Sequence, residues 1–152
     1  MVQNGLRILP LEPTDFEDWL DLSSALFTKT PKEQLETKLR RKEQQGKYQT
    51  FMARMDGNSI GFITVTLRTD YVEGTTTSPV GYMEAIYVLP EYRKLGVAKA
   101  LYQKGESWCK DLGCTEMGSD TWYWKKEAHN FHKKLGFNEG DVLVHFNKKI
   151  DP

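Results

Sequence analysis

The segment "YMEAIYVLPEYRKLGVAKALYQKGESW" at residues 82–108 constrains the fold more than any other part of the chain. Its first part belongs to a largely apolar run over residues 81–89, which favours a strand buried at the centre of a sheet. A proline and then Gly96 interrupt this run, and apolar residues recur at a near-helical spacing after the glycine. The sequence therefore predicts a strand, a tight turn and a helix over residues 97–112.

The glycine turn offers a place for an anion. Gly96 can adopt a positive φ and carries no side chain that would block a ligand. Backbone N–H groups at a helix start form an anion-binding nest, which the helix dipole and the cations Arg93, Lys94 and Lys99 reinforce. A phosphate or pyrophosphate would suit this nest. The spacing matches neither a P-loop nor a Rossmann turn, so a plain tight turn with a solvated basic face explains these residues as well.

Periodicity and turn residues predict the remaining elements of one mixed α/β domain. Two helices follow a short first strand, and Asp56-Gly57-Asn58 is a hairpin turn between two strands of alternating character. A short strand, a helix ended by a glycine and a last strand complete the chain. The predicted ranges are a strand at 6–11, helices at 14–27 and 31–46, strands within 48–71, a strand at 115–120, a helix at 125–135 and a strand at 141–150.

The charge balance narrows the functional classes. The 152 residues contain 21 Lys plus Arg and 21 Asp plus Glu, and this zero net charge argues against a nucleic-acid-binding protein. No apolar run approaches the roughly 20 residues of a membrane span, so no membrane partner is expected. Cys109 and Cys114 form no metal-ligand pattern and are interpreted as two reduced thiols. These features favour a cytoplasmic protein without a metal.

Two carboxylates stand out by position. Glu84 lies in the middle of the apolar strand, where a charge costs stability unless it has a partner. It is either a functional group or a strand residue that faces solvent or an internal salt bridge. Asp120 follows the predicted strand at 115–120, at the end of the sheet where α/β proteins collect ligands, although a helix N-cap would also account for it.

Three segments carry a resemblance to a known family. "IYVLPEYRKLGVAKALYQKGESWCKDLG" resembles motif A of the GNAT superfamily of acyl-CoA-dependent N-acyltransferases, whose R/Q-x-x-G-x-G/A pattern is matched by Arg93, Gly96 and Ala98. "AHNFHKKLGF" resembles motif B. "DYVEGTTTSPVGYMEAIYVLPEYRKLGVAKAL", "GCTEMGSDT" and "FHKKLGF" together resemble the aminoglycoside 6′-N-acetyltransferases within that superfamily.

The resemblance implies a fold and an activity. The fold would be a mixed, mostly antiparallel twisted sheet with a splayed parallel strand pair and flanking helices, in one acetyl-CoA-dependent domain over residues 1–152. The activity would be transfer of an acetyl group from acetyl-CoA to the 6′-amine of an aminoglycoside, which confers antibiotic resistance. The resemblance also implies a homodimer, because many members of the subgroup are dimers, and the predicted strand at 141–150 has an apolar face to share.

The resemblance also implies how acetyl-CoA is held. Its pyrophosphate would lie on backbone N–H groups of residues 94–98, and its pantetheine arm would lie along residues 86–88, where the sheet of the family splays. His132 takes the motif B slot in which many relatives have a tyrosine acid, and it would contact the CoA sulfur or simply pack. The implied cofactor-binding residues are Ile86, Val88, Arg93, Lys94, Leu95, Gly96, Val97, Ala98, Lys99 and His132.

Acidic residues are implied for the amine substrate. An aminoglycoside amine is mostly protonated at neutral pH, and a carboxylate can bind the ammonium and then help to remove its proton. Glu84 and Asp120 are the candidate catalytic residues on this basis. Several acids around one cleft would suit a polycation. The implied substrate-binding residues are Asp70, Tyr71, Glu73, Glu84, Asp120 and Asp141, with an ordinary solvated loop as the alternative for Asp70 and Glu73.

Several alternatives stay open at this level. Trp122, Tyr123 and Trp124 would stack on a sugar ring or on CoA, or pack in the core or at a dimer contact. The same acids would also serve an acetyltransferase for polyamines or for protein amines. A catalytically silent acyl-CoA-binding module would bind CoA without turnover of any amine. The carboxylates at 84, 120 and 141 argue against this last class.

Overall fold

A computed structural model describes residues 5–152, which fall into two compact units, one within residues 1–120 and one at residues 121–152. The first unit contains a sheet and three α-helices, and the second contains one α-helix followed by a segment without regular structure. The strands of the first unit are β1 (Arg7–Pro10), β2 (Tyr48–Met55), β3 (Asn58–Arg68), β4 (Val80–Val88) and β5 (Met117–Ser119), and its helices are α1 (Phe16–Leu26), α2 (Lys32–Gln45) and α3 (Val97–Asp111).

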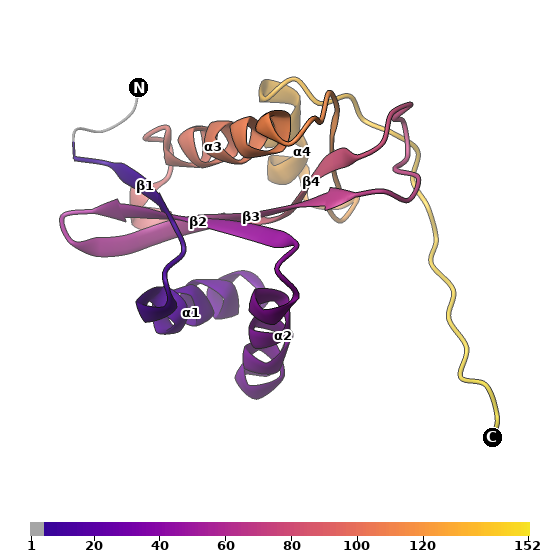
Figure 1. Ribbon diagram of the computed structural model, residues 1–152, viewed down its shortest axis with the longest axis horizontal. Helices are drawn as coiled ribbons and strands as arrows, with labels where there is room; N and C mark the ends of the chain where they lie inside the picture. Colours follow the sequence, from indigo (N-terminus) through magenta and orange to yellow (C-terminus); the bar gives the residue numbers. More distant parts are fainter. Residues whose placement is uncertain (1–4) are drawn as a thin grey trace. The chain divides into compact units, whose positions relative to one another are not determined.

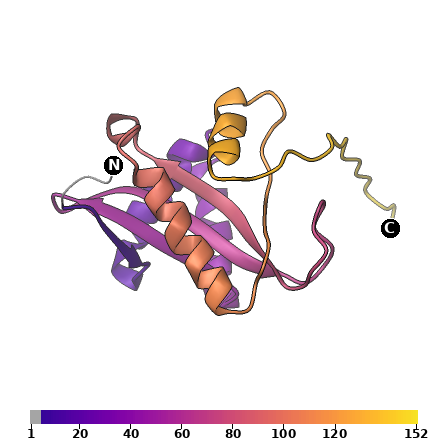
Figure 2. The same ribbon diagram turned by 90° about the horizontal axis from the view of Figure 1, so that it is seen from above.

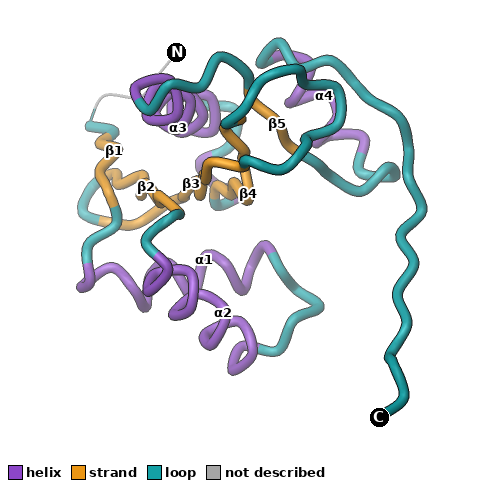
Figure 3. Tube along the Cα trace, turned by 45° about the vertical axis from the view of Figure 1, so that its right-hand side comes forward, coloured by secondary structure: helices purple, strands orange, loops and turns teal. Residues whose placement is uncertain are grey.

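The five strands form one sheet in the order β1-β2-β3-β4-β5. Pairing is antiparallel from β1 to β4, and β4 and β5 run parallel because α3 makes the crossover between them. Figure 3 shows β5 beside β4 at the edge of the sheet. The expected mostly antiparallel sheet with one parallel pair is confirmed, and so is the hairpin between β2 and β3, whose turn is Asp56-Gly57.

Helices cover both faces of the sheet. Figure 1 shows α1 and α2 on one face and α3 on the other. The first face buries Phe16, Trp19 and Leu20 of α1, Leu35 and Leu39 of α2, and Met52 and Phe62 of the sheet in one apolar cluster. Such a two-sided cover explains why the sequence of β4 is a largely apolar run.

α3 lies close against the sheet on the other face, over β3 and β4 (Figure 2). Gly105 makes the approach possible, because a Cβ at this position would come within 2.9 Å of Val65 and 3.1 Å of Ile63. The apolar stripe of α3 places Val97 and Leu101 in the core. The helix predicted over 97–112 is therefore confirmed with its apolar face on the sheet.

The start of α1 differs from the sequence prediction. The chain makes a 3₁₀ turn at Pro13–Asp15, and α1 begins at Phe16. Asp15 is buried, accepts a hydrogen bond from the backbone of Glu12 and pairs with Arg54 of β2. This tertiary ion pair, which the local sequence does not contain, fixes the entry into the helix.

The second unit consists of α4 (Lys126–Lys134) and the segment that follows it. Gly136 has a φ of 96° directly after the C-cap residue Leu135, as predicted for the end of this helix. The strand predicted at 141–150 is wrong, because residues 138–152 form neither helix nor strand. Val142, Val144 and Phe146 are 73%, 74% and 91% exposed. Their alternation is that of a strand, but a strand forms only where a neighbour supplies the ladder of hydrogen bonds.

Three further properties of the described residues bear on function. None of their helices is long and apolar enough to span a membrane. Residues 5–152 bring no three metal-ligating side chains together. Cys109 and Cys114 are free thiols, both buried, and burial raises the pKa of Cys109 to about 12. These thiols are therefore not poised to react at neutral pH.

Candidate active site

The turn before α3 has the backbone of an anion nest. Gly96 is the N-cap of α3 with a φ of 84°, and Lys94 also has a positive φ of 63°. The first N–H groups of an α-helix have no partner inside the helix, so they are left to a ligand or to water. Nε of Arg93 donates to the carbonyl oxygen of Val88 at 2.9 Å and fixes the turn to the end of β4. The turn therefore fits a pyrophosphate through its backbone.

β4 loses one partner halfway along its length. It pairs with β5 only at Gly81–Met83, whereas it continues to Val88 along β3. Within residues 5–120 no other strand pairs with the β5-facing edge of residues 84–88. This unpaired stretch is the splay expected between β4 and β5, and an extended pantetheine arm would lie along it as a further strand does.

Glu84 occupies a bulge at the start of this splay. Val65 of β3 lies opposite Met83 and Thr64 lies opposite Ala85, so Glu84 has no partner of its own across the ladder. A bulge turns a side chain away from the regular alternation, and bulges are common next to active sites. The position of Glu84 in the middle of an apolar strand, which was ambiguous in sequence, therefore has a geometric explanation.

The Glu84 carboxylate is held by a cation. Nε of Arg68 lies 3.2 Å from Oε2, and Nη2 lies 3.1 Å from both carboxylate oxygens. The Glu84 side chain is only 15% exposed, so the pair is partly shielded from water. Lys42 of α2 is a second cation near this carboxylate. Burial lowers the pKa of the Lys42 ammonium, and the negative charge of Glu84 opposes this shift.

Asp120 is bound to β4 by a neutral donor. The Tyr82 hydroxyl donates to Oδ2 of Asp120 at 2.5 Å. Burial, and after it the hydrogen bond to Asp120, raises the pKa of the Tyr82 phenol, so the proton stays on the tyrosine at neutral pH. The guanidinium carbon of Arg68 lies 3.4 Å from the centroid of the Tyr82 ring. Arg68 therefore contacts both Glu84 and Tyr82, and the structure brings the two predicted catalytic acids into one cluster.

The loop at residues 69–79 is fastened beside this cluster. Val72 is buried with Val80 and Tyr82, so the loop is packed against the tyrosine that holds Asp120. Glu116 holds the second half of the loop. Its Oε1 accepts hydrogen bonds from the backbone N–H groups of Thr76 and Thr77 and from the Thr77 hydroxyl. The loop carries three predicted substrate-binding residues, Asp70, Tyr71 and Glu73, and all three are exposed.

Two predicted site residues belong to the second unit. His132 is part-buried in α4, where its Nδ1 lies 2.6 Å from the carbonyl oxygen of Ala128 and its ring contacts Phe131 and Phe137. A carbonyl only accepts, so Nδ1 is the donor in this contact. Asp141 is exposed.

The three aromatic residues before α4 are not core residues. Trp122, Tyr123 and Trp124 are 60%, 62% and 53% exposed. Trp122 and Trp124 stack on each other with centroids 4.8 Å apart, and Tyr123 meets Trp124 edge-on at 5.4 Å. Core packing within this chain, one of the alternatives from sequence, is therefore wrong for all three.

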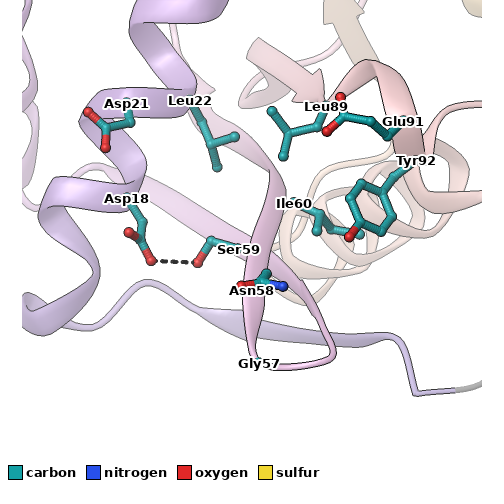
Figure 4. Close-up of a pocket in the computed structure, with 10 residues that line it drawn as sticks. All are labelled: Asp18, Asp21, Leu22, Gly57, Asn58, Ser59, Ile60, Leu89, Glu91 and Tyr92. Atoms are coloured by element: carbon teal, nitrogen blue, oxygen red, sulfur yellow. Dashed lines mark hydrogen bonds between the residues drawn. The ribbon is translucent and has the colours of Figure 1, made fainter.

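A cavity of about 610 Å³ (Figure 4) is lined by none of the residues of the acid cluster. It is bounded by the start of α1, by the turn between β2 and β3, and by the residues that follow β4. Asp18, Asp21 and Glu91 give it an acidic wall, and Asp18 accepts a hydrogen bond from the Ser59 hydroxyl at 2.8 Å. None of the predicted site residues lines this cavity.

Sequence reasoning missed the groups that connect the two acids. Arg68 is the last residue of β3, and Tyr82 lies in β4 two positions before Glu84. A tyrosine in an apolar strand looks like an ordinary core residue, and an arginine at a strand end looks like a solvated charge. The only available signal was the requirement that a carboxylate inside an apolar strand have a cationic partner.

Comparisons with known proteins agree with this geometry. Residues 15–137 match the model of the acetyltransferase (GNAT) family. The chain is 36% identical over 146 residues to an aminoglycoside N(6′)-acetyltransferase type 1 of Acinetobacter haemolyticus, which covers 96% of this chain and 100% of that protein. Among solved structures, aminoglycoside N-acetyltransferase AAC(6′)-Iy in complex with CoA superposes with a TM-score of 0.90 at 33% identity, covering 99% of this chain and 100% of the other.

A second structure of AAC(6′)-Iy contains the bisubstrate analogue CoA-S-monomethyl-acetylneamine. It superposes with a TM-score of 0.89 at 33% identity and covers 95% of this chain and 99% of the other. The similarity extends over nearly the whole chain. This protein therefore belongs to the acetyltransferase (GNAT) family, and it is similar over nearly its whole length to aminoglycoside N(6′)-acetyltransferases.

Proposed function

We propose that this protein transfers an acetyl group from acetyl-CoA to the 6′-amine of an aminoglycoside antibiotic and so confers resistance to it. The observation that carries this proposal is the 36% identity to an aminoglycoside N(6′)-acetyltransferase over 96% of the chain. The nest at the start of α3 and the splay beside β4 provide the two features that the co-substrate needs. The acid cluster provides the groups that a cationic amine needs.

The cofactor is held mainly by backbone in this proposal. Backbone N–H groups of residues 94–98 bind the pyrophosphate, and the edge of β4 at Ile86 and Val88 pairs with the pantetheine arm. The side chains of Arg93, Lys94 and Lys99 are exposed and add positive potential around the phosphates. Acetyl-CoA supplies an activated acetyl group as its thioester. His132 of motif B is proposed to lie near the sulfur.

The chain's own carboxylates prepare the amine. The nitrogen must lose a proton before it can attack a carbonyl carbon, and a carboxylate within reach can accept that proton directly or through a water molecule. Asp120 and Glu84 are proposed for this site, with Asp70, Tyr71, Glu73 and Asp141 around the rest of the polycation. Backbone N–H groups of β4 that lack a β5 partner are the natural donors to the carbonyl oxygen as it gains charge.

The test is an initial-rate assay of CoA release with a panel of amines. Kanamycin should be acetylated at the 6′-position, whereas spermidine and a lysine peptide should give far lower kcat/KM. Product position is read by NMR of the acetylated antibiotic. A preference for spermidine or for the peptide would replace the aminoglycoside assignment, and binding of CoA without turnover of any amine would indicate a silent module.

We further propose that residues 1–152 act as one acetyltransferase domain in the cytoplasm and that the protein is a homodimer. The segment 138–152 supports the dimer, because Val142, Val144 and Phe146 alternate as in a strand and are exposed in the single chain. A second copy would cover these exposed apolar side chains. Light scattering should give twice the mass of 17.6 kDa. Val144→Lys should shift the mass to the monomer, whereas Lys148→Gln, a change at a charged residue of the same segment, should not. A wild-type monomer at micromolar concentration would contradict the dimer.

A further inference from the structure

The two acids of the site have different surroundings. Glu84 has both oxygens on the Arg68 guanidinium and lies within electrostatic reach of Lys42. Asp120 accepts one hydrogen bond, from Tyr82, and within residues 5–120 it has no ion-pair partner. A carboxylate whose lone pairs and charge are already satisfied by a guanidinium is a weak ligand for another cation. Asp120 is the acid that is left with capacity for one.

Arg68 links the two acids physically. Its guanidinium is planar and makes a two-point contact with Glu84, which a lysine does not reproduce. The same group lies over the Tyr82 ring, with its central carbon 3.4 Å from the ring centroid. The other end of that tyrosine holds Asp120. The connected groups are therefore Glu84, Arg68, Tyr82 and Asp120, in that order, and all four belong to the first unit.

We propose that Glu84, Arg68 and Tyr82 are positioning residues that orient Asp120 as the carboxylate which binds the substrate ammonium and accepts its proton. This division of roles rests on the proposed acetyltransferase function. Glu84 fixes the guanidinium, the guanidinium fixes the tyrosine ring, and the tyrosine hydroxyl fixes Oδ2 of Asp120. Oδ1 is then left to the amine. In the reaction the N–H bond of the ammonium breaks, its electron pair stays on nitrogen, and the proton goes to Oδ1.

The first experiment compares Arg68→Met with Arg54→Met. Arg54 lies in β2 of the same sheet and forms an ion pair with Asp15. The side chains of Arg54 and Asp15 are 30% and 8% exposed, and those of Arg68 and Glu84 are 41% and 15% exposed. The control pair is therefore buried at least as much as the pair under test. Both substitutions should lower Tm. Only Arg68→Met should lower kcat for the aminoglycoside, by about 10- to 100-fold, because a misplaced catalytic group costs that much. KM for acetyl-CoA should stay unchanged in both. Arg68→Lys should recover only part of the loss, since it keeps the charge without the two-point contact.

Tyr82→Phe tests the hydrogen bond between the Tyr82 hydroxyl and Asp120. It keeps the ring under Arg68 and removes only the hydroxyl that holds Asp120. It should lower kcat in the wild-type background and have no further effect on Asp120→Asn, because the hydroxyl acts only through that carboxylate. Independent, multiplying effects of the two substitutions would contradict the proposal. Wild-type kcat in folded Arg68→Met would also contradict it, and a raised kcat would show that Arg68 competes with the substrate for Glu84.

A readout without turnover separates this inference from the proposed function. Crystal structures of Arg68→Met and Arg54→Met should show the Tyr82 ring and the Asp120 carboxylate displaced only in the former. Unmoved Tyr82 and Asp120 in Arg68→Met would overturn the positioning role, whether or not the protein acetylates an aminoglycoside. Displaced side chains together with an inactive wild-type protein would instead keep the positioning role and reject the proposed function.

Discussion

The acid cluster and the nest before α3 are built in different ways. Glu84, Arg68, Tyr82 and Asp120 are held by contacts between side chains of two strands, β3 and β4, and the residue that follows β5. The nest consists of backbone whose shape depends on Gly96 and on the start of a helix. Because side chains hold the cluster together, its geometry should depend on the identity of each of the four residues. The nest should tolerate most substitutions and fail at the one position where a side chain cannot be accommodated.

The largest effect is expected at Asp120. Asp120→Asn keeps the shape of the side chain and loses its charge and basicity, so kcat should fall by about 10²–10⁴-fold at neutral pH. The loss should shrink as pH rises and more of the amine is already neutral. Glu84→Gln should lose less. Steady-state rates between pH 6 and pH 9 measure both variants. If both variants kept the wild-type kcat, neither carboxylate would be the base. The rate would then come only from positioning of the substrates and from the small fraction of the amine that is neutral.

The nest should fail at Gly96. Gly96→Glu places a side chain where φ is 84° and brings a negative charge to the phosphates, so acetyl-CoA binding should be abolished in calorimetry. Lys99→Gln removes only an exposed charge nearby and should weaken binding by no more than about fivefold. Unchanged affinity in folded Gly96→Glu would exclude the turn as the cofactor site. A Lys99 effect as large as that of Gly96 would mean that side chains, and not backbone, carry the binding.

A smaller effect is expected at Asp141, which lies in neither region. As an exposed ligand of a polycation, it should contribute an ion pair of modest strength. Asp141→Asn should therefore raise KM for the antibiotic about two- to fivefold and leave KM for acetyl-CoA and kcat unchanged. Kinetics with each substrate varied in turn make this check. A lower kcat would place Asp141 among the catalytic groups.

The smallest effect is expected at Glu116, which anchors the loop beside the cluster. Hydrogen bonds from the Thr77 hydroxyl and the Thr76 backbone lower the pKa of Glu116 in the folded protein. Its contribution to stability is therefore present above the pKa of the unfolded chain and is lost as pH falls through the lower folded pKa. Glu116→Gln should lower Tm by about 1–3 °C at pH 7, and the difference should disappear as pH falls through the lowered pKa of Glu116. A Tm difference that persists in acid would exclude the ionised carboxylate as its cause.

Much of the fold followed from local sequence. The apolar run of β4, the glycine at 96 and the stripe of α3 are each dictated by short-range periodicity and backbone freedom, and all three are present as predicted. Glu84 and Asp120 were recognisable because charged groups at those positions need an explanation. The strand predicted at 141–150 was wrong. Alternation of apolar and polar residues indicates which side chains a strand would bury, but it does not indicate whether another strand is present to pair with it.

The sequence by itself determined the strand β4, the turn at Gly96 and the helix α3, and it predicted an anion nest at that turn. Only the tertiary structure decided what the acids contact. The bulge at Glu84, its pairing with Arg68 sixteen residues earlier and the bond from Tyr82 to Asp120 all depend on which residues lie side by side in the assembled sheet. Register between strands is set by packing of the whole sheet, and a one-residue change would place these side chains on opposite faces.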